Sequence, residues 1–264
     1  MKHVVITGAY GGMGYATAKK FASNGYVVFA LDKKVQQKEE NIIPIEVDLT
    51  DISSVENAYN EVKKVTSKIF AIIHFAGVYM LNSLVEISNE DFDKIFKINL
   101  YGAFYVNKTF LPLLDNNSRI LMTTSELAPL DPLPFTGIYA ITKSALDKYA
   151  YSLKMELQLL GVSVSVLRAG AVSTGMLGVS TSELDKFCNN TTHYKCNAER
   201  FKKIVLSVEA KSVTTEKIAD KTLNIIEAKK PKFTYKINRN KLLLLLSALP
   251  KRFQLWIIKK ILIK

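Results

Sequence analysis

The chain contains, near its start, the glycine-rich stretch Thr7-Gly8-Ala9-Tyr10-Gly11-Gly12-Met13-Gly14. An apolar run over 3–7, typical of a buried strand, precedes it, and a helical pattern over 14–23 follows it. Glycines let a backbone approach a pyrophosphate, and the N-terminus of a helix offers free N–H groups and the positive end of its dipole. A tight turn without a ligand has the same composition, but the strand and helix on either side favour a dinucleotide-binding turn.

Apolar runs and helical patterns alternate along most of the chain. Further strands are expected over 26–31, 43–47, 69–75, 119–124, 162–167 and 232–237. Helices are expected between them over 53–66, 91–111, 138–160 and 214–227. Such alternation builds βαβ units with right-handed crossovers, and these give a parallel sheet covered on both faces. The sequence therefore predicts an α/β fold with a doubly wound, Rossmann-type parallel sheet.

The length of 264 residues suits one large domain, and we expect residues 1–238 to form a single cofactor-binding catalytic domain. Cys188 and Cys196 are too few for a disulfide framework, and their spacing with His193 matches no common zinc site, so no metal is expected. The first apolar run leads directly into the glycine turn, which indicates a strand rather than a secretory signal. A cytoplasmic protein is the expectation.

Two acidic residues follow the predicted second and third strands. Asp32 lies where a carboxylate can accept hydrogen bonds from the adenosine ribose, and it would repel a 2′-phosphate. Asp48 is a candidate contact near the adenine. Lys33 and Lys34 come directly after Asp32 and could accommodate a phosphate. The sequence thus predicts NAD as the cofactor and leaves NADP open.

Tyr139 and Lys143 lie four residues apart at the start of the helix predicted over 138–160, and so on one helix face. A free tyrosine has a pKa near ~10, and a nearby ammonium group lowers that pKa by favouring the phenolate. An acid or base works best when its pKa lies near the operating pH. This spacing is common on helix surfaces, but together with the nucleotide turn it indicates an oxidoreductase in which the pair moves a proton.

These motifs resemble those of the short-chain dehydrogenase/reductase family over roughly residues 3–175, and the steroid and retinol dehydrogenase branch in particular. The stretch 7–14 matches the pattern TGxxxGxG, and Tyr139 and Lys143 match YxxxK. Ser125 matches the serine after the fifth strand, and Asn99 matches the asparagine of the long fourth helix.

The resemblance implies a role for each of these residues. Tyr139 would exchange the proton of the substrate oxygen, and Lys143 would lower the tyrosine pKa and bind the nicotinamide ribose. Ser125 would hydrogen-bond the substrate oxygen, with Thr124 as the alternative in another register, and Asn99 would position a water in a proton relay. The expected cofactor contacts are Gly8, Gly12, Met13, Gly14, Asp32, Asp48, Ala76, Gly77, Tyr139, Lys143, Val172 and Thr174, the last holding the carboxamide.

The chain departs from the family pattern after the fourth and sixth strands. His74-Phe75-Ala76-Gly77 stands where the family has Asn-Asn-Ala-Gly, so the structural task of the lost asparagine must pass to another group. Ala169-Gly170 replaces Pro-Gly, which loosens a turn. The stretch 175–201 is polar without strong periodicity, and we expect a substrate loop over about 175–210. Tyr79, Phe135 and Tyr194 could line an apolar pocket or pack in the core, and a bulky alcohol or ketone such as a steroid, retinoid or lipid is the expected substrate.

The basic charge is concentrated at the end of the chain. The net charge is +12, and residues 229–264 contain eleven Lys or Arg and no Asp or Glu, so the body is nearly neutral and nucleic acid is not an expected partner. Residues 239–264 form a basic, apolar, helical extension whose apolar pieces are too short to span a bilayer. It could bury itself in the interface of a homo-oligomer, a dimer or tetramer, or over the substrate pocket. Peripheral contact with an anionic membrane is the other expectation.

Three functions compete at this point. The first is an NAD(P)-dependent oxidoreductase that interconverts a secondary alcohol and a ketone by hydride transfer. The second is a catalytically silent NAD(P)-binding regulator, and the third is a membrane-tethered interaction protein that works through its extension. A silent protein has no need of Asn99, Ser125, Tyr139 and Lys143 together, so their presence favours the enzyme.

Overall fold

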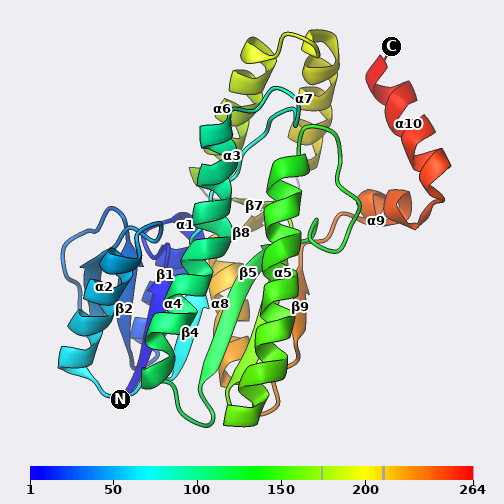
Figure 1. Cartoon of the computed structure of the whole chain (residues 1–264). Helices are drawn as coiled ribbons and strands as arrows, with labels where there is room; N and C mark the ends of the chain where they lie inside the picture. Colours follow the sequence, from blue (N-terminus) through cyan, green and yellow to red (C-terminus); the bar gives the residue numbers. More distant parts are fainter. Residues whose placement is uncertain (174, 210–211, 264) are drawn as a thin grey trace.

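The fold is seen in a computed structural model of the chain, which describes residues 1–173, 175–209 and 212–263. Among these residues, a sheet of seven parallel strands has the order β3-β2-β1-β4-β5-β6-β9 (Figure 1). The strands are β1 (Lys2–Thr7), β2 (Tyr26–Asp32), β3 (Ile42–Glu46), β4 (Ala71–His74), β5 (Arg119–Ser125), β6 (Ser163–Ala169) and β9 (Thr234–Ile237). The order reverses between β1 and β4, so the predicted doubly wound sheet is confirmed, and ligands of such sheets bind at this reversal.

Helices cover both faces of the sheet (Figure 1). On one face lie α1 (Gly12–Ser23) and α8 (Thr215–Glu227), which bury Phe21 and Ile218. On the other face lie α2 (Ile52–Val65), α4 (Gly102–Phe110) and α5 (Gly137–Leu157), which bury Val62, Phe110 and Leu146. The two apolar layers hold the strands in place, so the carboxyl ends of β1, β4 and β5 form a rigid platform for the site.

The helix expected over 91–111 is interrupted. Helix α3 (Asn89–Phe96) passes into a π-helical turn over Lys97–Tyr101 before α4 begins. A π-helical turn fits one extra residue into a helix, and such turns are frequent at functional sites. Here the turn contains Asn99, whose buried side chain bonds the backbone of another segment. Helical periodicity alone could not reveal this insertion.

The prediction of a loop over about 175–210 is wrong, because two helices form most of this segment. They are α6 (Gly175–Asn190) and α7 (Lys195–Glu209). The pair buries Leu184, Phe187 and Phe201 around Phe135, whose ring centroid lies 4.6 Å from that of Phe187. The Glu86 carboxylate ties the link between the helices to the body by accepting a hydrogen bond from Thr191 Oγ1 at 2.7 Å.

Two short strands, β7 (Val172–Ser173) and β8 (Val213–Thr214), pair in parallel on either side of the two helices. They bring the ends of the α6–α7 segment together beside the carboxyl edge of the main sheet.

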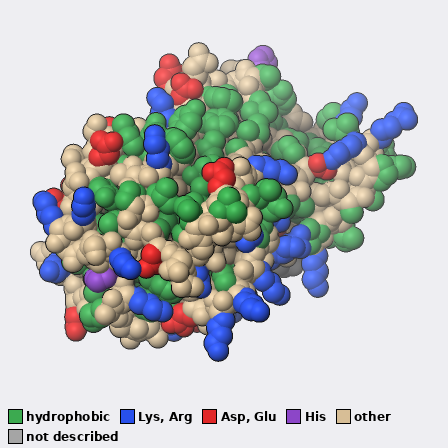
Figure 2. Space-filling model, turned by 60° about the horizontal axis from the view of Figure 1, so that its bottom comes forward, with side chains coloured by type: hydrophobic (Ala, Val, Ile, Leu, Met, Phe, Trp, Pro, Cys, Tyr) green, Lys and Arg blue, Asp and Glu red, His purple; other side chains and the backbone are tan. Residues whose placement is uncertain are grey.

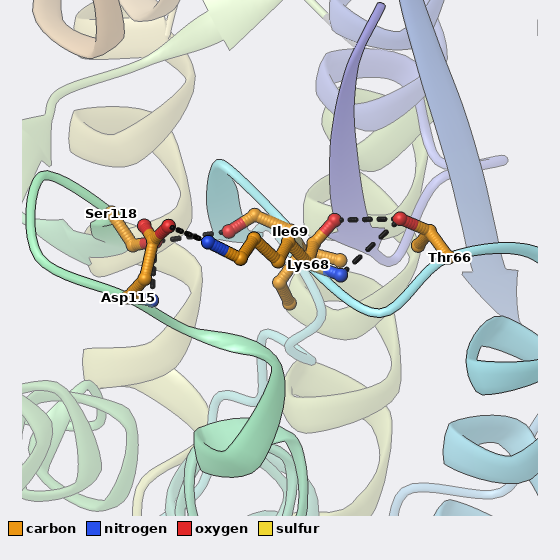
Figure 3. Close-up of polar contacts among 5 residues, drawn as sticks. All are labelled: Thr66, Lys68, Ile69, Asp115 and Ser118. Atoms are coloured by element: carbon orange, nitrogen blue, oxygen red, sulfur yellow. Dashed lines mark hydrogen bonds and ion pairs between the residues drawn. The ribbon is translucent and has the colours of Figure 1, made fainter.

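A polar cluster fixes the opposite, amino-terminal ends of β4 and β5 (Figure 3). Ser118 Oγ donates to the Ile69 carbonyl at 3.0 Å, and Lys68 Nζ pairs with Asp115 at 3.1 Å. Thr66 Oγ1 donates to the carbonyl oxygen of Lys68 at 2.9 Å, which closes the turn into β4 (Figure 3). The cluster joins the amino-terminal ends of the two central strands, opposite the carboxyl ends where the candidate site lies.

The last part of the chain is helical, as expected. Helices α9 (Lys241–Ala248) and α10 (Lys251–Ile263) follow β9 and leave the sheet on the side of α7 (Figure 1). Leu262 is buried against α7, and Asn197 Nδ2 donates to the Leu262 carbonyl at 2.6 Å. Within the described part of the chain, none of the helices combines the length and the apolar character that crossing a bilayer requires.

Candidate active site

The glycine-rich turn brings backbone groups unusually close together. Gly8 has a φ of +66°, and a Cβ atom there would lie 2.6 Å from the backbone nitrogen of Ala76. A Cβ atom at Gly14 would lie 2.1 Å from the carbonyl oxygen of Gly8, so only glycine fits at either position. Gly11 is the N-cap of α1, and a glycine has no side chain to occupy the first N–H groups of the helix. These N–H groups and the helix dipole suit a pyrophosphate.

The turn forms one side of a groove that continues past the end of β4. Gly8, Gly12, Met13, Gly14 and Gly77 all line it. These are five of the expected cofactor contacts. The backbone N–H of Ala76, a further expected contact, donates to Thr7 Oγ1 at 3.5 Å and so lies against the turn.

Asp32 ends β2 and Asp48 follows β3, and the two carboxylates have different partners. Asp32 accepts hydrogen bonds from the backbone N–H groups of Tyr10 at 2.8 Å and Lys33 at 2.7 Å. Asp48 forms an ion pair with Lys33 Nζ at 2.7 Å and accepts from the backbone N–H and hydroxyl of Thr50. These bonds lower the Asp48 pKa to about 2, the one with Lys33 contributing most. Lys33 is therefore drawn toward Asp48.

Asn99 uses its whole amide to hold the chain after β4. Its Oδ1 accepts from the Val78 backbone N–H at 2.8 Å, and its Nδ2 donates to the Val78 carbonyl at 3.0 Å and to Thr142 Oγ1 at 3.1 Å. A Cβ atom at Gly77 would lie 3.2 Å from Asn99 Oδ1 and 3.3 Å from Lys143 Nζ. The side chains of Asn99 and Lys143 thus converge on the glycine that ends the cofactor groove.

Tyr139, Ser125 and Lys143 come together at the carboxyl edge of the sheet. Tyr139 lies in the first turn of α5, and its phenol shares a hydrogen bond with the side chain of Ser125 at the end of β5. Lys143 Nζ lies 5.8 Å from the centroid of the Tyr139 ring. Tyr79 packs edge-on against the same ring, with 4.8 Å between the centroids.

Burial dominates the proton affinities of this pair. It raises the pKa of Tyr139 to about 12, against the opposing effect of the hydrogen bond with Ser125. It also lowers the pKa of Lys143 to about 8, because the ammonium is removed from water. Desolvation of the phenolate is therefore the largest influence on the Tyr139 pKa in this geometry, and a lowering of that pKa by Lys143 stays a prediction.

The neighbouring Thr124 faces a different environment. Its Oγ1 donates to Asp147 Oδ1 at 3.2 Å, and Arg168 binds the same carboxylate through Nε at 2.9 Å and through its NH2 group at 2.6 Å. Thr124 thus belongs to a buried network that ties β5, α5 and β6 together. The contact with Tyr139 is made by Ser125, which leaves little reason to choose the alternative register.

His74 takes over the place of the family's asparagine. The buried ring lies 2.9 Å from Asn107 Oδ1 through Nε2 and 3.4 Å from Thr7 Oγ1 through Nδ1. It therefore links β4 to α4 and to β1. In this way the residue that replaces the family's asparagine contributes to the stability of this part of the sheet. Burial lowers the His74 pKa to about 4, so the imidazole is neutral at physiological pH.

A mostly apolar cavity of about 230 Å³ opens beside Tyr139. Met13 and Val172, both expected cofactor contacts, line it, as does Tyr79. Phe135 and Tyr194 pack instead around α6 and α7, with ring centroids 5.3 Å apart. The remaining apolar walls are Phe75, Val78, Leu127, Leu133, Ala169, Ala171, Phe201, Ile204, Val205 and Leu243. Thr174, expected to hold the cofactor carboxamide, lies outside the described residues.

Sequence reasoning missed Glu126, the carboxylate in this cavity wall. It follows Ser125 directly, is buried, and accepts a hydrogen bond from the Asn240 backbone N–H at 2.6 Å through Oε2. The only signal available was an acidic residue immediately after a predicted buried strand, where a charged side chain is unusual.

Comparison with known proteins agrees with this geometry. A family model described as short chain dehydrogenase matches residues 2–185. The NADPH-dependent 1-acyldihydroxyacetone phosphate reductase of Schizosaccharomyces pombe is 30% identical over 233 residues, which are 83% of this chain and 76% of that protein. Estradiol 17-beta-dehydrogenase 2 of Mus musculus is 31% identical over 191 residues, which are 67% of this chain but only 50% of the mouse protein.

A solved structure agrees in fold. A short chain dehydrogenase family protein from Francisella tularensis superposes with a TM-score of 0.75 at 20% identity, covering 90% of this chain and 97% of that one. The family match and the identity to a named reductase confirm the resemblance seen in the sequence motifs. The chain therefore belongs to the short-chain dehydrogenase/reductase family of NAD(P)-dependent oxidoreductases, which act on alcohols and ketones.

Proposed function

We propose that this enzyme interconverts a secondary alcohol and a ketone of a bulky apolar molecule, with Tyr139 as the proton donor and acceptor. The observation that carries the proposal is the hydrogen bond between Tyr139 and Ser125 at the polar end of a cavity whose walls are otherwise mostly apolar. A ketone oxygen placed against these two hydroxyl groups would leave its apolar substituents among Tyr79, Leu127 and Phe201.

Each side chain has a distinct part in this proposal. Tyr139 transfers the proton to or from the substrate oxygen, while Ser125 donates a hydrogen bond to that oxygen and stabilises its developing charge. Lys143 supplies the positive charge that favours the phenolate. Asn99 fixes the backbone at Val78 and is proposed to position a relay water. When bound, the nicotinamide cofactor supplies or accepts the hydride.

The cofactor fits the glycine turn, where Gly8 and Gly14 leave no space for a side chain. We propose NAD in preference to NADP, although the fission yeast relative is named as NADPH-dependent. Two backbone N–H groups hold the Asp32 carboxylate in place, where it would repel a 2′-phosphate. Lys33, which could neutralise a phosphate, is paired with Asp48. The other proposed cofactor contacts are Gly12, Met13, Ala76, Gly77, Tyr139, Lys143 and Val172, and Thr174 by resemblance.

The names of relatives support an apolar substrate, since one is named for an acylated dihydroxyacetone phosphate and another for estradiol. The proposal is tested with steroid, retinoid, long-chain acyl and sugar ketones, each with NADH and NADPH, by following cofactor absorbance. We expect kcat/KM to be at least about tenfold higher for the apolar ketones than for the sugars, since each buried methylene adds about 1 kcal/mol or more. Equal values for both groups, or no turnover of any ketone, would refute the proposal.

We also propose a homo-oligomer, a dimer or tetramer, formed through α4 and α5. Large side chains remain exposed on these two helices and on the turn between α3 and α4, among them Tyr101 at 48%, Tyr151 at 52% and Ile141 at 41%. Contiguous exposed apolar surface is typical of protein interfaces. Light scattering after size exclusion should give a multiple of the 29.6 kDa chain mass, and a Tyr101→Glu variant should shift the mass toward one chain.

Finally, we propose that this cytoplasmic enzyme binds anionic membrane surfaces peripherally through its extension. The outer face of α9 and α10 exposes Leu242 at 74%, Leu255 at 68% and Trp256 at 58%. Lys and Arg side chains lie among hydrophobic ones along the arm at the right of Figure 2, where Figure 1 places α9 and α10. Apolar side chains flanked by cations suit the interface of an anionic bilayer.

A further inference from the structure

Glu126 connects two parts of the chain that are far apart in sequence. Its backbone N–H continues the ladder between β5 and β6 by donating to the Ala169 carbonyl at 3.0 Å. Its side chain turns to the end of the sheet, where Oε2 accepts the Asn240 N–H at 2.6 Å. Asn240 is the N-cap of α9, and its own Oδ1 accepts from the Leu242 and Leu243 N–H groups at 2.9 and 3.3 Å. The residue after Ser125 therefore holds the first turn of the extension.

The surroundings of this contact are tightly packed. A Cβ atom at Gly170 would lie 1.8 Å from the Asn238 carbonyl oxygen and 3.0 Å from Glu126 Oε1. Asn238 has a φ of +53°, and its Nδ2 donates to the Ala171 carbonyl at 2.8 Å. The absence of a side chain at Gly170 leaves room for the segment that leads from β9 into α9. The turn at Ala169-Gly170, expected to be loosened, thus packs against Asn238 at the point where the chain leaves β9 for α9.

The extension also completes the substrate cavity. Leu243 of α9 lines the same cavity as Glu126. Beyond it, α10 braces α7, which contributes Phe201 to the cavity wall, through the buried side chain of Leu262. An ion pair between Lys251 and Asp131 ties the start of α10 to the segment between β5 and α5.

We propose that Glu126 is a positioning residue that seats α9 as a wall of the cavity, so that the extension determines how well a bulky substrate is held. The proposal rests on the proposed alcohol–ketone function for the identity of the cavity. Glu126 is not assigned a part in proton or hydride transfer. Its carboxylate is held in a buried place by a hydrogen bond from the Asn240 backbone N–H and by the positive charge of Arg239. Without the Glu126 carboxylate, the Asn240 N–H at the start of α9 would lose this hydrogen bond, and Leu243 would no longer be held against the cavity.

The test compares Glu126→Ala with Glu126→Gln, which keeps an acceptor oxygen for the Asn240 N–H. Initial rates are measured with methyl ketones of increasing chain length and with a steroid ketone. For Glu126→Ala we expect KM to rise about tenfold for the largest substrates, with kcat and the KM of the smallest ketone unchanged. Glu126→Gln should stay close to the wild type. Glu156→Ala, which alters an exposed carboxylate on α5, is the matched control.

A second variant keeps the proposal testable if Glu126→Ala does not fold. Leu243→Ala removes the wall without touching the carboxylate and should raise KM for the same large substrates. The single tryptophan, Trp256 in α10, gives a readout independent of turnover, because its fluorescence anisotropy should fall when α9 is released. If the wild type reduces none of the ketones, the proposed function fails, while the anisotropy still decides the role of Glu126. Unchanged anisotropy in Glu126→Ala, or an equal fall in kcat for small and large ketones, would overturn the inference.

Discussion

The ammonium of Lys143 donates a hydrogen bond to the Thr123 carbonyl oxygen at 3.2 Å from a buried position. The Thr123 hydroxyl, which also borders the cavity, is buried without a hydrogen-bond partner among the described residues. A buried cation with such limited compensation costs stability, and its pKa is lowered to about 8 as a result. The site therefore keeps, at the expense of stability, a group to which we assign a part in the proposed chemistry.

Lys143→Met should stabilise the cofactor-free protein while nearly abolishing turnover. Below pH 8 both the folded and the unfolded lysine are protonated, so the folded state bears the whole desolvation cost. Between pH 8 and the ordinary value of 10.5 the folded lysine is neutral while the unfolded lysine still binds a proton, so this cost shrinks as the pH rises. The gain should be on the order of a few kcal/mol at pH 7 and shrink toward pH 10.5. Urea unfolding of both proteins at several pH values measures it, and a destabilised variant at pH 7 would contradict the argument.

Tyr139→Phe should lower kcat at least about 100-fold and leave cofactor affinity nearly unchanged, because it removes only the phenolic oxygen. The measurements are single-turnover rates and NADH binding by fluorescence. Ser125→Ala, which removes the partner hydroxyl, serves as a comparison and should also lower kcat. A Tyr139→Phe protein that keeps more than about a tenth of wild-type turnover, with chemistry rate-limiting, would rule out the proton-transfer role.

His74→Asn should make the protein less sensitive to acid. The folded His74 pKa is about 4 and the ordinary value is 6.5, so in this window the unfolded state binds a proton that the folded state does not. The wild type should lose about 3 kcal/mol of unfolding free energy through this group as the pH falls from 6.5 to 4. Denaturant midpoints at pH 7 and pH 5 compare the two proteins. Parallel pH dependence in both would mean that His74 titrates normally.

Asp32→Ser should shift the cofactor preference toward NADPH. In the wild type we expect kcat/KM for NADH to exceed that for NADPH by about tenfold or more, because a carboxylate facing a phosphate costs several kcal/mol. Lys33→Ala is the control and should change the ratio little, since Lys33 is already paired with Asp48. A wild type that prefers NADPH would show that Lys33 or Lys34 outweighs the carboxylate.

Truncation before Lys241 should weaken binding to anionic vesicles and leave the cofactor domain folded. It removes Lys241, Lys251, Arg252, Lys259, Lys260 and Lys264, and each cation near the surface contributes about 1 kcal/mol. Because the truncation also removes Leu243 from the cavity, a Lys259→Glu/Lys260→Glu variant isolates the surface charge. Co-sedimentation at low and high salt, with a blue shift of Trp256 emission, reports binding. If the full chain ignores such vesicles at low salt, the extension serves only the cavity or an interface.

The sheet was predictable because its signals are local. The strand expected over 26–31 is observed over Tyr26–Asp32, and the glycine turn lies between β1 and α1 where its pattern indicated. The four catalytic candidates could be named from their motifs. The structure brings Ser125, Tyr139 and Lys143 together, and the side chains of Asn99 and Lys143 both approach Gly77.

Other features of the fold and the site could not be predicted, because they depend on contacts between residues that are far apart in the sequence. Leu184 and Phe187 of α6 and Phe201 of α7 are buried in one cluster with Phe135 and Leu262, which come from distant parts of the chain. Glu126 acquires its contact from a residue 114 positions later, which no spacing rule could indicate. The raised pKa of Tyr139 follows from burial in the assembled site, which the spacing of two residues along one helix does not report.

The main sheet ends with β9 at Ile237, before the extension begins, and the family match already ends at residue 185 within α6. The cavity walls contributed by Phe201, Ile204, Val205 and Leu243 all lie after that point. The glycine turn and a large share of the cavity wall therefore lie in separate parts of the sequence. Exchanging residues 186–264 between relatives would test whether this later part of the chain determines substrate selectivity.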